Sequence, residues 1–216
     1  EAEPVALRFA AMGYHAFVLR YSTYGMGEPG IFPLGGPEGG ELAVNPLSLH
    51  PAPMRDIGAA FLAIRSHAEE WLVDAERIAL CGFSAGAHNC AMYSVYWQDP
   101  LITGHLGASR EELRPAAAIL CYGIADYHLL FGEQRDAFAR RLRDAAGVAF
   151  LGTKAPSKEQ LDAVSPALCV TKSCPPTFLW ATAADALGAA ENSTSMATAL
   201  AKAGVPFESH VFEEGP

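Results

Sequence analysis

The sequence predicts an α/β fold in which a mostly parallel sheet is flanked by helices. Short apolar, β-prone runs alternate along the 216 residues with longer stretches whose apolar residues recur at helical spacing. Such alternation is typical of parallel strands joined by right-handed helical crossovers. A sharp turn, Gly82-Phe83-Ser84-Ala85-Gly86, joins one such strand to the helix after it. Half of the residues are hydrophobic and 18% are charged, which fits one globular domain over residues 1–216.

The first part of the chain reads as a helix, a strand, a long loop and a second helix. We expect a helix over residues 4–12, stopped by Gly13, and a buried strand over 14–21. The Gly- and Pro-rich segment 22–53 is a loop, and loops of that length are usually functional or insertions. Apolar residues at spacings of three and four then predict one helix face packed on the sheet: Met54, Ile57, Phe61, Ile64, Ala68 and Trp71.

The second part contains the remaining strands and a more polar segment. Apolar runs predict strands over 76–81, 116–122, 176–181 and 207–212, with helices after the Gly82–Gly86 turn and over 191–203. The polar segment of about 124–165, which includes a helix around 133–146, is interpreted as a cap or lid over the site. The strand and helix pattern thus places five strands in the sheet.

The Gly82–Gly86 segment is a G-x-S-x-G motif between a strand and a helix, which is the sequence pattern of a nucleophile elbow. Glycine lacks a Cβ, so the chain can turn sharply around the strained middle residue. The turn would lift the Ser84 hydroxyl off the strand end. The N–H of Ala85 would lie beside it at a helix N-terminus, as an oxyanion-hole donor.

A serine nucleophile needs a base and an acid that orients the base. In this fold the acid follows a later strand. Asp185, shortly after the run Pro175–Ala181, is the predicted acid, and a helix-capping loop aspartate is the alternative. Asp126, after the run ending at Tyr122, is a second candidate acid, against a turn of the cap.

The base is harder to place. His210 is the histidine that follows Asp185, but it lies within the strand 207–212, so we interpret it as a strand residue rather than the base. His88 is four residues after Ser84, on a helix that runs away from the site, and we interpret it as structural. The candidate site residues are therefore Ser84 and Asp185, with Ala85 in the oxyanion hole.

Segments spread over nearly the whole chain resemble one family. They are His50–Asp56, Ile64–Trp71, Asp74–Ile78, the elbow with His88, Pro175–Trp180, Glu191–Ser193 and Gly204–Glu208. The chain resembles the acetyl-xylan-esterase-like branch of the α/β-hydrolase superfamily, the short-chain carbohydrate esterases. That resemblance implies an α/β-hydrolase fold and hydrolysis of short-chain, chiefly acetyl, esters of carbohydrate through an acyl-enzyme.

The chain departs from that family at several points. The family has a His-Gly pair soon after the strand ending near Phe212, where the histidine is the base, and a glycine-rich oxyanion loop before the helix that residues 1–12 resemble. Neither is found here, so we expect a fragment incomplete at both ends. The family also has His at position 181, Asp at 184, Gly at 87 and Pro-Val-Val-Pro-Val after Asp185, where this chain has Ala181, Ala184, Ala87 and Ala186–Ala190.

Two other functions remain open. One is a serine exopeptidase of the same fold, and the other is a non-catalytic fragment or pseudoenzyme that binds a ligand or partner chain. The absent triad histidine favours the second. The expected partner of the esterase is a small-molecule or oligosaccharide ester.

Composition excludes several classes. The net charge of −9 argues against nucleic acid or an anionic membrane surface as partner, and no apolar run is long enough to span a bilayer. Gly35–Gly40 lacks the lysine of a phosphate loop, and no metal or cofactor pattern is found. Cys81 and Cys121 read as small core residues. Five cysteines without a disulfide framework favour a cytoplasmic location, although a signal peptide could precede residue 1.

Overall fold

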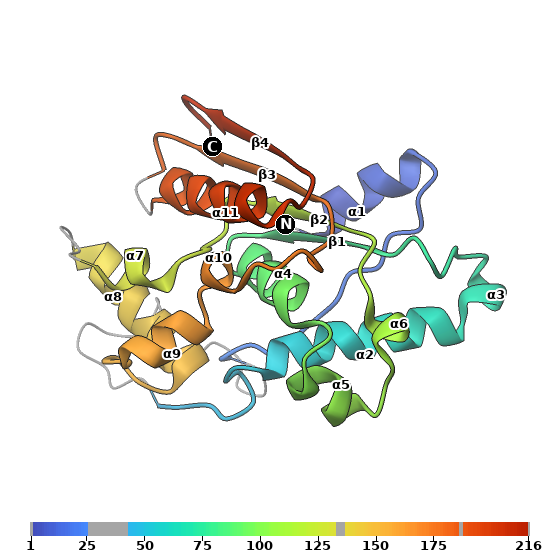
Figure 1. Cartoon of the computed structure of the whole chain (residues 1–216), viewed down its shortest axis with the longest axis horizontal. Coiled ribbons are helices and arrows are strands. Elements are labelled where there is room, and N and C mark those ends of the chain that lie inside the picture. The colour runs from blue at the N-terminus through green and yellow to red at the C-terminus, as the bar shows by residue number, and fades with distance from the viewer. Residues whose placement is uncertain (1, 26–42, 133–136, 186–187, 216) are drawn as a thin grey trace.

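The computed structural model describes residues 2–25, 43–132, 137–185 and 188–215. Within those ranges the sheet has four strands in sequential order, and each neighbouring pair is parallel (Figure 1). They are β1 (Ala79–Phe83), β2 (Ala117–Cys121), β3 (Thr177–Thr182) and β4 (Phe207–Phe212). Four of the five predicted strands are present, with small shifts at their ends, and the parallel α/β architecture is confirmed.

The predicted strand over residues 14–21 is wrong. This segment is not a strand, and most of its side chains are exposed. A strand exists only when a neighbour accepts and donates its backbone hydrogen bonds. Among the described residues the sheet ends at β1, and β1 pairs with β2 alone, so the β-prone residues 14–21 have no strand beside them.

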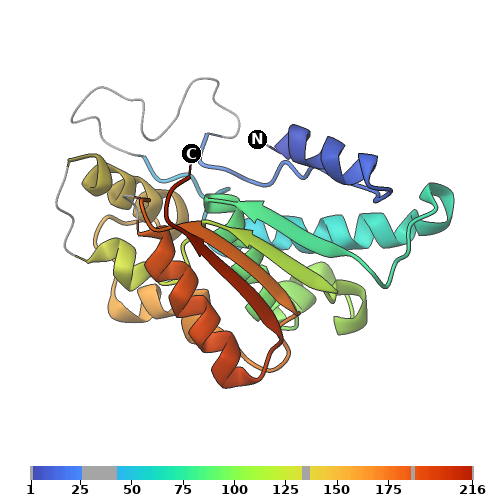
Figure 2. The same ribbon diagram turned by 90° about the horizontal axis from the view of Figure 1, so that it is seen from above.

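Helices α4 (Ala85–Tyr96) and α11 (Ala189–Ala203) cover one face of the sheet (Figures 1 and 2). Side chains of the strands that point to this face are buried, among them Leu80, Leu120 and Leu179. Behind α4 lies a second layer of helices, α2 (Ala52–Ser66), α5 (Pro100–Leu106) and α6 (Arg110–Leu113). The core of the molecule therefore lies between the sheet, α4 and this second layer.

The predicted apolar helix face is present but interrupted. Met54, Ile57, Phe61 and Ile64 are buried on α2, as the spacing predicts. The helix ends at Ser66, and Trp71 belongs to a separate turn of helix, α3 (Ala68–Trp71). His67 lies between the two, and its ring stacks on Trp71 with centroids 4.5 Å apart.

The other sheet face is more open. Cys81, predicted as a core residue, is exposed on β1, whereas Cys121 on β2 is buried as predicted. Helix α1 (Ala2–Ala11) and residues 14–21 lie beyond β1 and enclose with it a hollow of about 610 Å³. Because α1 buries none of its residues, it does not seal the sheet, and this explains the exposure of Cys81.

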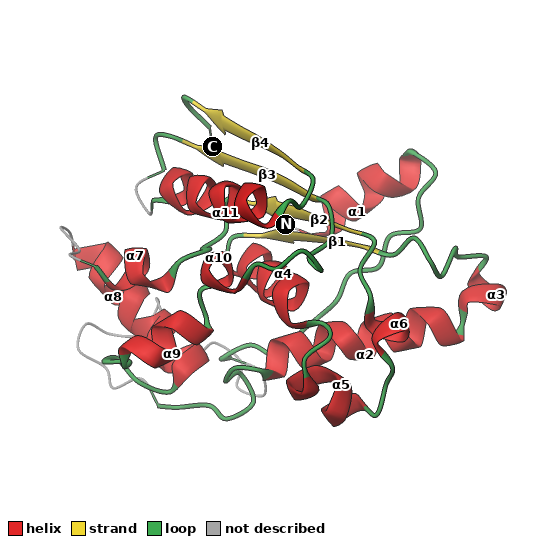
Figure 3. Cartoon of the chain, viewed as in Figure 1, coloured by secondary structure: helices red, strands yellow, loops and turns green. Residues whose placement is uncertain are grey.

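Helices of the predicted cap segment lie together on the side toward which the strands run (Figure 3). They are α7 (Tyr127–Phe131), α8 (Ala137–Ala146), the π-helical turn Gly147–Leu151 and α9 (Lys158–Ala163), and α10 (Pro166–Cys169) follows just beyond the predicted segment. Two carbonyl groups of the π-helical turn accept hydrogen bonds from the earlier loop: the Ser48 hydroxyl donates to Ala149 O (2.7 Å) and the His50 N–H to Phe150 O (2.9 Å). The segment is thereby fastened to residues 48–50. Its role as a cap remains a prediction.

The predicted loop 22–53 lies partly outside the described residues, as does the start of the predicted helix around 133–146. In the described ranges, no helix has both the length and the apolar character that crossing a bilayer requires.

Candidate active site

Ser84 stands at the turn between β1 and α4 in a backbone conformation that residues other than glycine rarely adopt. Its φ is 50° and its ψ is −120°, values typical of a glycine-favouring turn position. The conformation is held from both sides, because the Ser84 N–H donates to Cys121 O (3.0 Å) and the His88 N–H donates to Ser84 O (3.1 Å). The predicted sharp turn with a strained serine is therefore present.

Gly82 makes this turn sterically possible. A Cβ at Gly82 would overlap the carbonyl group of Gly86 and lie 2.7 Å from the Ala87 nitrogen. At Gly86, in contrast, an added Cβ would meet only the Tyr21 hydroxyl, at 4.0 Å. The strict requirement for glycine in the G-x-S-x-G motif thus falls on its first position.

Both groups needed for acyl transfer at the elbow are accessible. The Ser84 side chain and Ala85 are exposed, and among the described residues the Ser84 hydroxyl makes no hydrogen bond. Ala85 is the first residue of a 12-residue helix, so its N–H points out of the helix N-terminus, where partial positive charge accumulates. A carbonyl oxygen beside Ser84 would meet that N–H.

Asp185 follows β3 at the same edge of the sheet as Ser84. In a parallel sheet the carboxyl ends of all strands meet at one edge, and the register pairs Phe83 with Cys121 and Cys121 with Trp180. The Asp185 N–H donates to Thr182 O (3.3 Å), and the Gly188 N–H donates to Asp185 O (3.2 Å). Asp185 as a residue is partly buried in this tight turn. The sheet thus brings the elbow and the predicted acid to one edge, while the role of Asp185 stays a prediction.

Asp126, the alternative acid, caps a helix. Its Oδ1 accepts the His128 N–H at 2.8 Å, and the Ser165 hydroxyl lies 3.4 Å from the same oxygen. This capping of α7 agrees with the turn interpretation given above and engages one of the two carboxylate oxygens.

His88 is a structural residue of α4, as interpreted from the sequence. Its ring is buried, its Nε2–H donates to Val164 O (2.9 Å), and it packs against Tyr127 and Phe150. Burial away from water lowers the pKa of His88 to about 4, an effect that the Val164 carbonyl partly opposes. A ring held in this way is neutral and turned into the core, away from solvent.

His210 is likewise engaged within the sheet. It lies in the middle of β4, where its Nε2 is 2.6 Å from Glu208 Oε1 and its ring stacks on Phe212. His128 pairs with Asp162 at 2.7 Å on the cap segment. Each of these histidines therefore has a partner away from Ser84, and the structure brings none of them to the Ser84 hydroxyl.

Two features of this edge were not anticipated. Tyr122, directly after β2, has a φ of 43°, and its ring lies 5.0 Å from that of Trp180 and 5.9 Å from that of Phe83. Asn192, which the sequence offers only as part of Glu191–Ser193, is buried at the start of α11. Among the described residues, no group of three His, Cys, Asp or Glu side chains could hold a metal ion.

Comparison with known proteins agrees with this fold. The model of the BD-FAE family matches residues 44–200, which is more than half of the chain. The chain belongs to the BD-FAE family. The resemblance to the carbohydrate-esterase branch of the α/β-hydrolases is thereby confirmed.

Relatives of this BD-FAE family member include enzymes that act on xylan-related substrates. Endo-1,4-beta-xylanase B of Butyrivibrio fibrisolvens is 29% identical over 215 residues, which are 100% of this chain and 29% of that protein. A solved acetyl ester-xyloside bifunctional hydrolase from Caldicellulosiruptor lactoaceticus is 29% identical, with a TM-score of 0.72, over 99% of this chain and 66% of that one. A carboxylesterase from Lactobacillus plantarum WCFS1, described as putative, is 30% identical, with a TM-score of 0.69, over 100% of this chain and 70% of that one. The chain thus spans less than a third of the xylanase and about two thirds of the two solved structures.

Proposed function

We propose that this BD-FAE family member is the nucleophile-bearing part of a serine esterase that removes short acyl groups, acetyl first among them, from carbohydrate. The observation that carries the proposal is the exposed Ser84 hydroxyl, held by a strained turn beside the Ala85 N–H. A strained residue at a sheet edge persists only where the surrounding structure enforces it, and such residues cluster at functional sites. The printed names of the xylanase and acetyl-ester relatives support the substrate class.

In the proposed reaction, Ser84 Oγ attacks the acyl carbon while a histidine takes the serine proton. The oxyanion that forms is held by the Ala85 N–H and a second backbone N–H. Collapse of the tetrahedral intermediate expels the sugar alcohol, which receives the proton from the histidine, and leaves an acyl-Ser84 ester. Water then attacks this ester by the same route. Asp185 orients the histidine and stabilises its protonated form.

None of the described histidines is assigned as the base, since His88, His128 and His210 each have another partner. This observation favours a second candidate, a non-catalytic domain that binds an acylated ligand at the elbow. The two functions differ in whether a covalent acyl-Ser84 forms and turns over.

The test uses the expressed gene product that contains residues 1–216, with p-nitrophenyl acetate and acetylated xylo-oligosaccharides as substrates. Ser84→Ala is expected to lower kcat by several orders of magnitude, because loss of the nucleophile disables the whole triad. Ser66→Ala, at an exposed serine of α2, is the matched control and keeps parental activity. Residual activity of S84A within tenfold of the parent contradicts the assignment. Binding of the oligosaccharides without any acetate release favours the non-catalytic candidate.

The acid is tested by Asp185→Asn and Asp126→Asn. An amide at position 185 favours the wrong histidine tautomer, so D185N is expected to lose several orders of magnitude in kcat. D126N is expected to be mild, since an amide oxygen still accepts the His128 N–H that caps α7. If D126N is the more damaging of the two, the acid is Asp126. Release of p-nitroaniline from aminoacyl anilides, absent in S84A, would instead favour the exopeptidase.

A further inference from the structure

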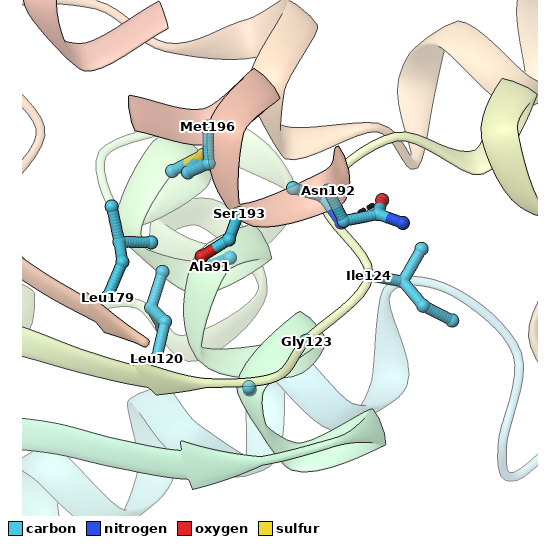
Figure 4. A pocket seen from close by; sticks show the side chains of 10 residues that line it. Ala91, Leu120, Gly123, Ile124, Leu179, Asn192, Ser193 and Met196 are labelled. Carbon is cyan, nitrogen blue, oxygen red and sulfur yellow. Dashed lines mark hydrogen bonds between the residues drawn. The ribbon is translucent and has the colours of Figure 1, made fainter. Parts of the chain in front are cut away.

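Asn192 is a buried polar side chain between the two loops that follow β2 and β3. It lies in the first turn of α11 with 2% of its surface exposed, beside the small apolar space lined by Leu120, Leu179 and Met196. Figure 4 shows its amide group projecting from α11 toward the backbone beyond Gly123. A buried amide is costly unless its donors and acceptors are satisfied, so its partners indicate what it does.

The Asn192 side chain connects these two loops directly. Its Oδ1 accepts the N–H groups of Ala125 (2.8 Å) and Asp126 (2.9 Å), in the loop after β2. Its Nδ2 donates to Gly188 O (3.0 Å), in the loop after β3. Backbone N–H groups only donate and a carbonyl only accepts, so these partners fix which amide atom is oxygen and which is nitrogen.

The Gly188 end of this connection leads to the predicted acid. Gly188 O accepts both the backbone and the side-chain N–H of Asn192, and the Gly188 N–H donates to Asp185 O at 3.2 Å. Gly188 has a φ of 73°, a left-handed conformation that glycine adopts readily. The two hydrogen bonds from Asn192 to Gly188 O therefore hold the end of this loop in place.

The Ala125 end leads to the elbow. Gly123, two residues earlier, packs so closely on α4 that an added Cβ would lie 2.7 Å from the Ala87 Cβ. Ala87 is three residues after Ser84 and is buried. The loop after β2, to which Asn192 is hydrogen-bonded, thus packs directly against α4, the helix that follows Ser84.

We propose that Asn192 is a positioning residue that fixes the Asp185 carboxylate relative to Ser84 by tying the loop after β3 to the loop after β2. This inference rests on the proposed esterase function. Asn192 touches neither the substrate nor the reacting atoms. Its contribution is geometric, and a displacement of about 1 Å at a catalytic group costs on the order of 100-fold in rate.

Asn192→Asp removes the side-chain hydrogen bond to Gly188 O and leaves an acceptor for the loop after β2. The aspartate keeps an oxygen for the Ala125 and Asp126 N–H groups but presents its second oxygen to the Gly188 carbonyl, which repels it. In the expressed gene product that contains residues 1–216, we expect kcat for p-nitrophenyl acetate to fall about 10- to 100-fold with KM within about threefold, because geometry in the transition state is lost and ground-state binding is not. Thr194→Ala, which removes an exposed hydroxyl that donates to Ala190 O on the same helix, is the control and keeps parental kinetics.

The pH profile separates positioning from mere folding support. A carboxylate beside the catalytic histidine favours the protonated ring, so a displaced Asp185 lets that ring lose its proton at lower pH. The acidic limb of kcat/KM in N192D is expected to move to lower pH, by about 0.5 to 1 unit, in properly folded enzyme. A loss of thermal stability alone would not move this limb.

Three further variants make the outcome decisive. S84A and D185N are assayed in parallel: if they retain activity, the proposed function fails, whereas if they are inactive and N192D has parental kcat and pH profile, only the role of Asn192 is refuted. A lower kcat with an unshifted acidic limb also refutes positioning. If N192D does not fold, Asn192→Ser, which brings no opposing charge, is measured in the same way with the same two outcomes.

Discussion

Replacement of His88 by glutamine should reduce the dependence of the folded state on pH. The buried ring has a pKa of about 4, well below the usual value of about 6.5 that it regains on unfolding. Between these values the unfolded chain binds a proton that the folded chain excludes. The stabilising effect of neutral His88 is therefore complete above about pH 6.5 and is lost as the pH falls toward 4.

The expected magnitude follows from the two pKa values. At pH 5 the lost stability is about 1.4 kcal/mol for each unit between 6.5 and 5, or about 2 kcal/mol, and below pH 4 it approaches about 3 kcal/mol. Glutamine supplies an N–H for Val164 O without a titratable ring. Whatever the stability of the H88Q chain at neutral pH, its free energy of unfolding should change less between pH 8 and pH 5, by about 2 kcal/mol.

The assay is urea unfolding at pH 5, 6, 7 and 8, followed by circular dichroism, on residues 1–216. His105→Gln, at an exposed histidine of α5, controls for the loss of an imidazole as such. His50→Gln gives a second case, because burial also lowers the pKa of His50 to about 4. If the pH dependence of H88Q matches that of the parent to within about 0.5 kcal/mol, the buried ring is not the source of the acid sensitivity and the reasoning is refuted.

Three other outcomes are expected. Ser84→Gly should be more stable than Ser84→Ala by about 1 kcal/mol and should therefore unfold at a higher temperature, because glycine relieves the strained φ of 50°. Equal melting temperatures of the two variants would show that the turn is not strained. Gly123→Ala should destabilise the folded state by about 1–3 kcal/mol, because the new Cβ clashes with the Ala87 Cβ. Adding Ala87→Gly to the same chain should recover part of that loss. If denaturant unfolding shows that the effects of the two substitutions simply add, the contact is contradicted. Residues 1–216 alone should not hydrolyse p-nitrophenyl acetate at an enzymatic rate, because no described histidine reaches the Ser84 hydroxyl, and turnover lost in S84A would point to His210 as the next residue to mutate.

Local sequence was enough to predict the elbow and most of the sheet. Gly82 and Ser84 are dictated by steric overlap within five residues, so their arrangement follows from the motif itself. The strands β2, β3 and β4 were found because their apolar runs are bounded by Pro115, Pro175 and Pro206 or glycine. These features depend on residues that are close in the sequence, so they can be predicted from one sequence alone.

The misjudged features depend on neighbours in space. Residues 14–21 have the composition of a strand, but no described strand lies beside them, and Cys81 is exposed because α1 does not seal β1 on that face. The positive φ of Tyr122 contradicts the preference of its own residue type and is imposed by contacts with β1 and β3. Asn192 gave no signal beyond its place in Glu191–Ser193, because its partners are far away in the sequence.

The hydrogen-bond ladder of the sheet does not stop where the strands end. Ser84 N–H donates to Cys121 O, Tyr122 N–H to Trp180 O, and Ala183 N–H to Phe212 O, so each chain leaves the edge from a fixed point. Side chains beyond these points can be exchanged without breaking the ladder itself. Laboratory evolution that starts from the proposed esterase should therefore randomise positions such as Ile124 and Ala184, and leave the steps of the ladder, Asp185 and the contacts of Asn192 unchanged.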